Sequence, residues 1–166
     1  MAEIQLFAAD ERVELIEGAI VDMPPIGSLH AATVTALAER LIRSIGASAH
    51  VRVQQPVTLG PDSEPQPDLA VVTGRPERYR AEHPRPEDVL LVVEVADATL
   101  RFDLDVKARL YACNGIAEYW VVDLVNRKLH VLGGRRGDEY SRRGAFASGV
   151  VSAEPLRVGI DVAELF

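Results

Sequence analysis

The sequence of 166 residues has very little cysteine and no long apolar run. Cys113 is the only cysteine, which excludes an internal disulfide framework and any zinc site built from several cysteines. No apolar stretch approaches the roughly 20 residues that a membrane-spanning helix needs. The first residues, Met1 to Gln5, lack the basic start and apolar stretch of a signal peptide. We therefore expect a cytoplasmic protein without membrane contact.

The chain also lacks the surplus of basic residues that is typical of nucleic-acid-binding proteins. Its formal net charge is −7, whereas a protein that binds phosphates uses lysine and arginine to replace their counterions. The basic residues are concentrated locally instead. They form two groups: Arg75, Arg78, Arg80 and Arg85, and then Arg135, Arg136, Arg142 and Arg143. A solvated surface explains these arginines at least as well as contact with DNA does.

What the chain does have is the composition of a soluble globular protein. Hydrophobic residues make up 48% and charged residues 26%, which is enough of each to form an apolar core and a solvated surface. The length suits one domain, spanning residues 1–166, that buries its own core. No internal repeat, low-complexity tract or long linker divides it.

Short apolar or alternating segments predict strands, and two stretches with helical spacing predict helices. An N-terminal hairpin is expected at about 13–23, with its turn at Glu17-Gly18. Apolar positions at helical spacing predict a first helix that begins at Ser28 and ends at Gly46. Further strands are expected at 51–59, 69–72, 89–95, 118–124 and 128–132, a second helix at 102–113, and a short last helix after Asp161. This order predicts an α/β or α+β fold in which helices pack on a sheet.

Two acids stand where they could form a metal site. Glu94 interrupts the apolar strand at 89–95, where a carboxylate is costly to bury unless it is paired or binds a cation. Asp68 begins the preceding strand, so the two carboxylates converge if these strands are neighbours. Such oxygen ligands suit Mg²⁺ or Mn²⁺. Spacing alone fits equally well a turn aspartate at position 68 and a buried glutamate paired with an arginine such as Arg101.

Several segments along the chain, taken together, favour the metal site over these alternatives. Its parts are residues 14–18, His30, and residues 54–57, 63–72, 92–95, 103–107, 111–112 and 115–123. In this order they resemble the Uma2 family of restriction endonucleases, and the resemblance covers nearly the whole chain, from about Val13 to Phe166. It implies the restriction-endonuclease-like fold, a mixed sheet flanked by helices, of the PD-(D/E)XK superfamily.

The resemblance also implies an activity and a set of site residues. The implied function is a Mg²⁺- or Mn²⁺-dependent endonuclease, a hydrolase of DNA phosphodiester bonds, with Asp68 and Glu94 as catalytic metal ligands. The superfamily pattern places a lysine two residues after the glutamate, but this chain has Ala96 there. The resemblance points instead to Lys107, on the following helix, as the third catalytic residue.

Three more residues are candidates for supporting roles. His30, near the start of the first helix, could orient a water or a phosphate, although a structural histidine is the commoner case there. Gln55 lies on the strand before Asp68 and could contact the site. Glu14 could contribute an additional acid near the metal.

Other functions remain open from the sequence. The main alternative is a catalytically inactive protein of the same fold that binds DNA or protein, which the net charge and the missing lysine at position 96 favour. A weaker one is a hydrolase of another phosphate ester. Since one small nuclease domain often cuts a duplex as two copies, analogy predicts a homodimer.

Overall fold

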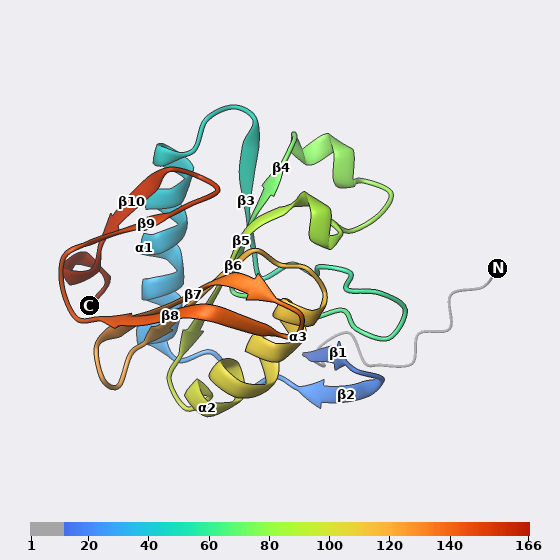
Figure 1. The fold of residues 1–166 in the computed structure, drawn as a ribbon, viewed down its shortest axis with the longest axis horizontal. Helices are drawn as coiled ribbons and strands as arrows, with labels where there is room; N and C mark the ends of the chain where they lie inside the picture. Colours follow the sequence, from blue (N-terminus) through green and yellow to red (C-terminus); the bar gives the residue numbers. More distant parts are fainter. Residues whose placement is uncertain (1–11) are drawn as a thin grey trace.

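A six-stranded mixed sheet forms the centre of the fold (Figure 1). The computed structural model describes residues 12–166; residues 1–11, including the N-terminal segment considered above for a signal peptide, lie outside the described residues. The strand order is β3-β4-β5-β6-β7-β8, and only the β5–β6 pair is parallel. The strands are β3 (Ala49–Val53), β4 (Leu69–Thr73), β5 (Val89–Ala96), β6 (Glu118–Asp123), β7 (Lys128–Arg136) and β8 (Glu139–Phe146). The mixed sheet with its helices confirms the predicted fold class.

Helices cover the two faces of this sheet. Helix α1 (Ser28–Ser44) packs on one face, where Leu37 and Leu41 join a core with Leu91 and Val93 of β5. A second, continuous helical segment at 100–113 packs on the other face. It consists of α2 (Leu100–Phe102), the π-helical turn η3 (Asp103–Lys107) and α3 (Ala108–Cys113). This segment is the crossover that the parallel β5–β6 pair requires.

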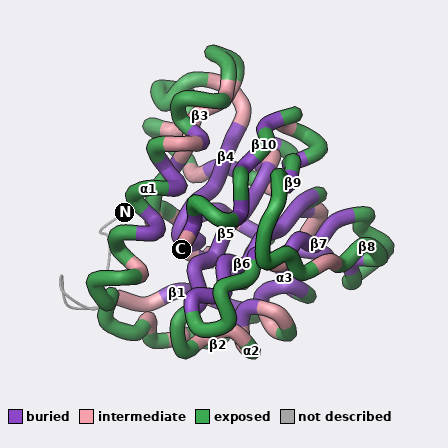
Figure 2. The backbone as a smooth tube through the Cα atoms, turned by 90° about the vertical axis from the view of Figure 1, so that its left-hand side faces the viewer, coloured by how far each residue is buried: buried purple, intermediate pink, exposed green. Residues whose placement is uncertain are grey.

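Strand β5 is apolar on both faces because both are covered. Its residues alternate between the α1 side and the side of the second helix, and Figure 2 shows the tube buried along β5 and β6. Glu94 therefore points into the side that the second helix covers, where its neighbours Val92 and Ala96 belong to the core. The predicted central strand is confirmed, and with it the burial of its carboxylate.

Two hairpins and several short helices complete the described chain. The predicted N-terminal hairpin is confirmed as β1 (Val13–Ile16) and β2 (Ala19–Asp22), joined by Glu17 at φ 49° and Gly18 at φ 79°. Positive φ at both turn residues is the conformation that a two-residue hairpin turn requires. The remaining elements are β9 (Val150–Ala153), β10 (Val158–Asp161), and the short helices η1 (Pro76–Tyr79), η2 (Pro86–Asp88) and η4 (Val162–Leu165).

The structure corrects three predicted element boundaries. Gly27, rather than Ser28, is the N-cap of α1, and no side chain caps it. The helix ends at Ser44 with Ile45 in an extended conformation, so Gly46 does not act as a left-handed terminator. The strand predicted at 51–59 ends at Val53, because Gln54 at φ 49° turns the chain away from the sheet. Within residues 12–166, no helix is both long enough and apolar enough to cross a membrane.

Candidate active site

Asp68 and Glu94 meet at one end of the β4–β5 pair. The two strands are antiparallel with Leu69 opposite Val93, so the residue before β4 lies beside the end of β5. The backbone N–H of Asp68 donates to Glu94 Oε2 at 3.2 Å. The backbone N–H of Val95 donates to Asp68 Oδ2 at 2.8 Å. The strand register thus holds both carboxylates at the position predicted from the sequence.

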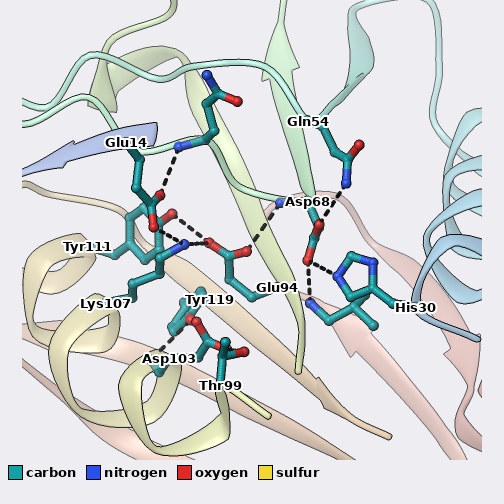
Figure 3. A network of polar contacts seen from close by, with 12 residues as sticks. Glu14, His30, Gln54, Asp68, Glu94, Thr99, Asp103, Lys107, Tyr111 and Tyr119 are labelled. Atoms are coloured by element: carbon teal, nitrogen blue, oxygen red, sulfur yellow. Dashed lines mark hydrogen bonds and ion pairs between the residues drawn. The ribbon is translucent and has the colours of Figure 1, made fainter. Parts of the chain in front are cut away.

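Lys107 reaches Glu94 from the second helix (Figure 3). Its Nζ lies 2.9 Å from Glu94 Oε1 and 3.1 Å from Glu14 Oε1, and the Tyr111 hydroxyl donates to the same Glu94 oxygen at 3.0 Å. On a regular α-helix, Lys107 would lie beside Val106, at the border of the apolar face of this segment. In the structure Lys107 is only 5% exposed, and its ion pairs are with Glu94 and Glu14.

The π-helical turn explains why Lys107 faces inward. The backbone N–H of Ala108 bonds to the carbonyl of Asp103, five residues back, so this turn holds one residue more than an α-helical turn does. The extra residue rotates the following side chain relative to a regular helix. Asp103 and Lys107 are the two buried side chains of this turn. A regular α-helix also places residues four apart on one face, so the extra residue changes how far the two side chains turn inward.

Two polar side chains fix Asp68 from the other side. His30 Nε2, from the first turn of α1, lies 3.0 Å from Asp68 Oδ2, and the Gln54 amide donates to Asp68 Oδ1 at 3.2 Å. Gln55, the predicted contact, is exposed and stays outside the site. The left-handed conformation of Gln54 ends β3 at Val53, so the amide that meets Asp68 is that of Gln54 and not that of Gln55.

Asp103 is a further acid of the site, which the sequence did not single out. It is 3% exposed, and the Thr99 hydroxyl donates to its Oδ2 at 2.6 Å. The Tyr119 hydroxyl donates to its backbone carbonyl at 3.1 Å. The spacing Asp103-x-x-x-Lys107 was a visible signal, because residues four apart share one face of a helix, and the structure buries both side chains in the π-helical turn.

These groups line a cavity of about 280 Å³. Its floor is acidic, with Glu14, Asp68, Glu94 and Asp103, and its wall includes the segment 23–27 between β2 and α1. Among residues 12–166, no three His, Cys, Asp or Glu side chains are arranged as a ready-made metal cage. An ion held here would therefore rest on two carboxylates and keep several waters, which is the usual preference of Mg²⁺.

Burial and charge shift the protonation of these groups in opposite directions. Burial, reinforced by the neighbouring carboxylates, raises the pKa of Glu94 to about 8 in spite of the attraction of Lys107. Burial also raises the pKa of Asp103. Burial opposes the ionisation of Asp68 too, but the hydrogen bonds from His30 and the Val95 N–H outweigh it and hold the pKa of Asp68 below its usual value.

The charge balance of the cavity fits a divalent cation. Six carboxylates line the cavity against two cationic side chains, those of Arg12 and Lys107. The surrounding carboxylates hold the pKa of Lys107 above its usual value against the effect of burial. The cavity thus carries more negative charge than its own cations offset. Carboxylate oxygens are the donors that hard divalent ions prefer, so Asp68 and Glu94 could bind one.

Comparisons with known proteins agree with this picture. The Uma2 family model, described as "Putative restriction endonuclease", matches residues 2–163. Among solved structures, a "putative nuclease belonging to DUF820" from Anabaena variabilis ATCC 29413 shares the fold, with a TM-score of 0.79 and 15% sequence identity over 98% of this chain and 93% of that one. No curated protein matches the sequence. At that identity, the structural likeness establishes the fold alone.

Proposed function

Because the chain belongs to the Uma2 family, whose model carries a restriction-endonuclease description, we propose that it hydrolyses DNA phosphodiester bonds with a divalent cation, Mg²⁺ or Mn²⁺. One observation carries the proposal. Asp68 before β4, Glu94 in β5 and Lys107 in the second helix come from three separate elements and converge in one cavity. Two carboxylates and a lysine in that arrangement are the groups that metal-assisted phosphodiester hydrolysis uses.

Each residue of the site has a distinct part in this proposal. Asp68 and Glu94 hold the cation, which when bound lowers the pKa of a water and offsets negative charge at a phosphodiester. The Lys107 ammonium orients the nucleophile and stabilises charge on the scissile phosphate, as a preorganised cation does. His30 and Gln54 hold the Asp68 carboxylate in one orientation. Glu14 holds the ammonium of Lys107 from the side opposite Glu94.

A catalytically inactive protein of the same fold is the second candidate, and one observation favours it. Both oxygens of Glu94 already accept hydrogen bonds, Oε1 from Lys107 and Tyr111 and Oε2 from the Asp68 N–H. A cation that binds Glu94 must therefore displace one of these donors or bind the same oxygen alongside it. Such a protein would bind DNA or another protein without cutting it.

A cleavage assay separates the two candidates. Purified protein is incubated with supercoiled plasmid, linear duplex and single-stranded DNA in Mg²⁺, in Mn²⁺ and in EDTA. The proposal requires cleavage with a divalent ion and none in EDTA. Asp68→Asn and Glu94→Gln should each abolish cleavage. Asp138→Asn, in the exposed turn between β7 and β8, is the matched control and should cut like wild type.

The outcomes of this assay are distinct. Cleavage that persists in both site variants comes from a contaminant or another site and contradicts the proposal. Folded protein that binds DNA but leaves all three substrates intact in both metals supports the inactive candidate. Hydrolysis of a small phosphate ester without cleavage of DNA would indicate a different substrate class.

A further inference from the structure

Among the residues that the structure describes, Arg52, outside the candidate active site, is a buried cation without an acid partner. It lies in β3, is 9% exposed, and takes part in none of the ion pairs within residues 12–166. Its Nη2 makes two long contacts, 3.5 Å to the Pro56 carbonyl and 3.4 Å to His83 Nδ1, while its buried Nε has no partner. A guanidinium offers five N–H donors, so this one leaves hydrogen-bonding capacity unused. Burying such a charge without a counter-charge is costly.

Tyr79, in the short helix η1, gathers further positive groups around this position. The Arg52 and Arg78 guanidinium carbons lie 5.7 and 5.6 Å from the centre of its ring. Arg78 also pairs with Asp88 at 2.7 Å. The surrounding segment, 74–86, carries four arginines against two glutamates. Within a chain of net charge −7, this region is locally positive.

His83 presents a hydrogen-bond donor beside Arg52. Its Nδ1 lies 3.4 Å from Arg52 Nη2, and a guanidinium can only donate, so this contact is a hydrogen bond in the tautomer whose Nδ1 carries no proton. The proton then lies on Nε2, at the far side of the ring. His83 is only partly buried, so this N–H is available to an acceptor from outside. An unsatisfied guanidinium and an adjacent N–H donor are the partners that a phosphate oxygen needs.

The position of this cluster relates it to the cavity. Arg52 pairs with Ala70, two residues after Asp68, and stands two residues before Gln54, which bonds to Asp68. Two residues along a strand span roughly 7 Å. Figure 1 shows the segment that carries η1 beside β4, on the side away from α1. One bound nucleic-acid strand can therefore reach both places.

We propose that Arg52 and His83, supported by Arg78 and Tyr79, bind a backbone phosphate of the DNA strand whose neighbouring phosphodiester occupies the cavity at Asp68 and Glu94. This inference rests on the proposed function for the identity of the ligand. Its chemistry is independent of cleavage, because a phosphate contact needs neither the cation nor Lys107. The cluster would set the register of the strand and contribute to KM rather than to kcat.

Binding in the absence of divalent ions tests the cluster separately from catalysis. Fluorescence anisotropy of labelled single-stranded and duplex DNA in EDTA, over a series of salt concentrations, gives the affinity and its salt dependence. Arg52→Gln should weaken binding severalfold to tenfold and lower the slope of log K against log salt by about one. Arg43→Gln, on the exposed face of α1, removes the same charge elsewhere and should leave both quantities unchanged.

A second variant keeps the test decisive if Arg52→Gln folds poorly. His83→Ala alters a partly exposed loop side chain and should also weaken binding, with its melting temperature near that of wild type. Affinities and salt slopes of both variants equal to those of Arg43→Gln would overturn the phosphate cluster, as would a wild-type protein that binds neither DNA. If cleavage fails while the loss of binding appears, the proposed function fails and the cluster stands.

Discussion

At the scale of single residues, Glu94 is an acid that the cavity shields from water, which raises its pKa to about 8. It is 4% exposed and accepts hydrogen bonds from Lys107, Tyr111 and the Asp68 N–H. Removing one partner of a buried charge leaves the other uncompensated, which costs more than the pair itself contributes. Substitutions in this cavity therefore change stability as well as chemistry, and tests of function need controls that separate the two.

Metal binding should be visible as thermal stabilisation. A ligand that binds only the folded state raises the melting temperature as its concentration exceeds Kd, and the carboxylates of this cavity are in excess of its cations. Mg²⁺ or Mn²⁺ should raise the melting temperature of the wild type, and Asp68→Asn or Glu94→Gln should each remove that shift. Calorimetric scans with and without metal check it. Equal shifts in the wild type and both variants would mean that the ion binds elsewhere.

Lys107→Ala should lower the rate of cleavage by on the order of a hundredfold, the scale expected for loss of one preorganised electrostatic group. The structure adds a second effect that the sequence did not predict. Glu94 and Glu14 lose their shared cation, so the variant should also lose about 3–5 kcal/mol of stability. Single-turnover cleavage, measured well below the melting temperature, and chemical denaturation give the two numbers.

Tyr111→Phe is the matched control for Lys107→Ala. It removes the other side-chain donor to the same Glu94 oxygen, at 3.0 Å, without removing a charge. It should cost stability but retain most of the cleavage rate. If both variants slow cleavage equally, Lys107 acts by positioning Glu94 and not by stabilising charge on the phosphate.

The neighbouring glutamines offer a second paired test. Gln54 donates to Asp68 Oδ1, whereas Gln55 is exposed. Gln54→Ala should raise the concentration of Mg²⁺ needed for half-maximal cleavage, because Asp68 loses a group that orients it. Gln55→Ala should match the wild type. Metal titrations of cleavage compare the two, and an equal response of both variants would remove Gln54 from the site.

At the scale of elements, the π-helical turn at Asp103–Lys107 is the feature on which the site depends most. It interrupts the second helix where two buried charged side chains must both face the sheet. A regular α-helix places successive residues 100° apart, so one extra residue changes which side chains point inward. Single π-helical turns of this kind are frequent at functional sites.

Deletion of Asp105 should convert this turn to a regular α-helix. Asp105 points outward, where its only ion pair within the described residues is an exposed one with Arg101 at 3.5 Å. The deletion changes the spacing of Asp103 and Lys107 from i,i+4 to i,i+3, which moves the Lys107 ammonium relative to Glu94, and cleavage should be lost. Circular dichroism should show the helix intact. Asp105→Ala keeps the length and should cut normally; cleavage by the deletion variant would show that the turn is not required.

At the scale of the whole molecule, the net charge limits how DNA can bind, and the number of copies limits how many strands can be cut. A net charge of −7 repels DNA at long range, so binding must come from local positive groups such as those around Arg52. One cavity of this kind can act on one strand at a time. Cutting both strands in a single encounter therefore requires a second copy of the chain.

The homodimer remains a prediction at this scale. Sedimentation equilibrium should give twice the protomer mass, either in solution or when duplex DNA is bound. A dimer should convert supercoiled plasmid to the linear form without a lasting nicked intermediate. Protomer mass under all conditions, together with accumulation of nicked plasmid, would contradict the dimer.

The sequence by itself determined the parts of this protein that depend on local physics. The hairpin turn at Glu17-Gly18 follows from a glycine that adopts positive φ without strain in a two-residue loop. The central strand follows from an apolar run too short for a helix, and Glu94 stood out because a carboxylate in such a run needs a partner. These signals lie within a few residues of one another along the chain, so no tertiary information was needed.

Only the tertiary structure decided how the candidate residues meet. Gln54, and not Gln55, contacts Asp68 because of the backbone conformation of Gln54, at φ 49°, where β3 ends. The inward orientation of Lys107 depends on a π-helical turn that the packing of the second helix stabilises against the regular α-helical pattern. The unpartnered Arg52 became visible only when β3 and the segment 74–86 came together. Contacts between distant segments depend on the free energy of the whole fold, which local sequence patterns do not encode.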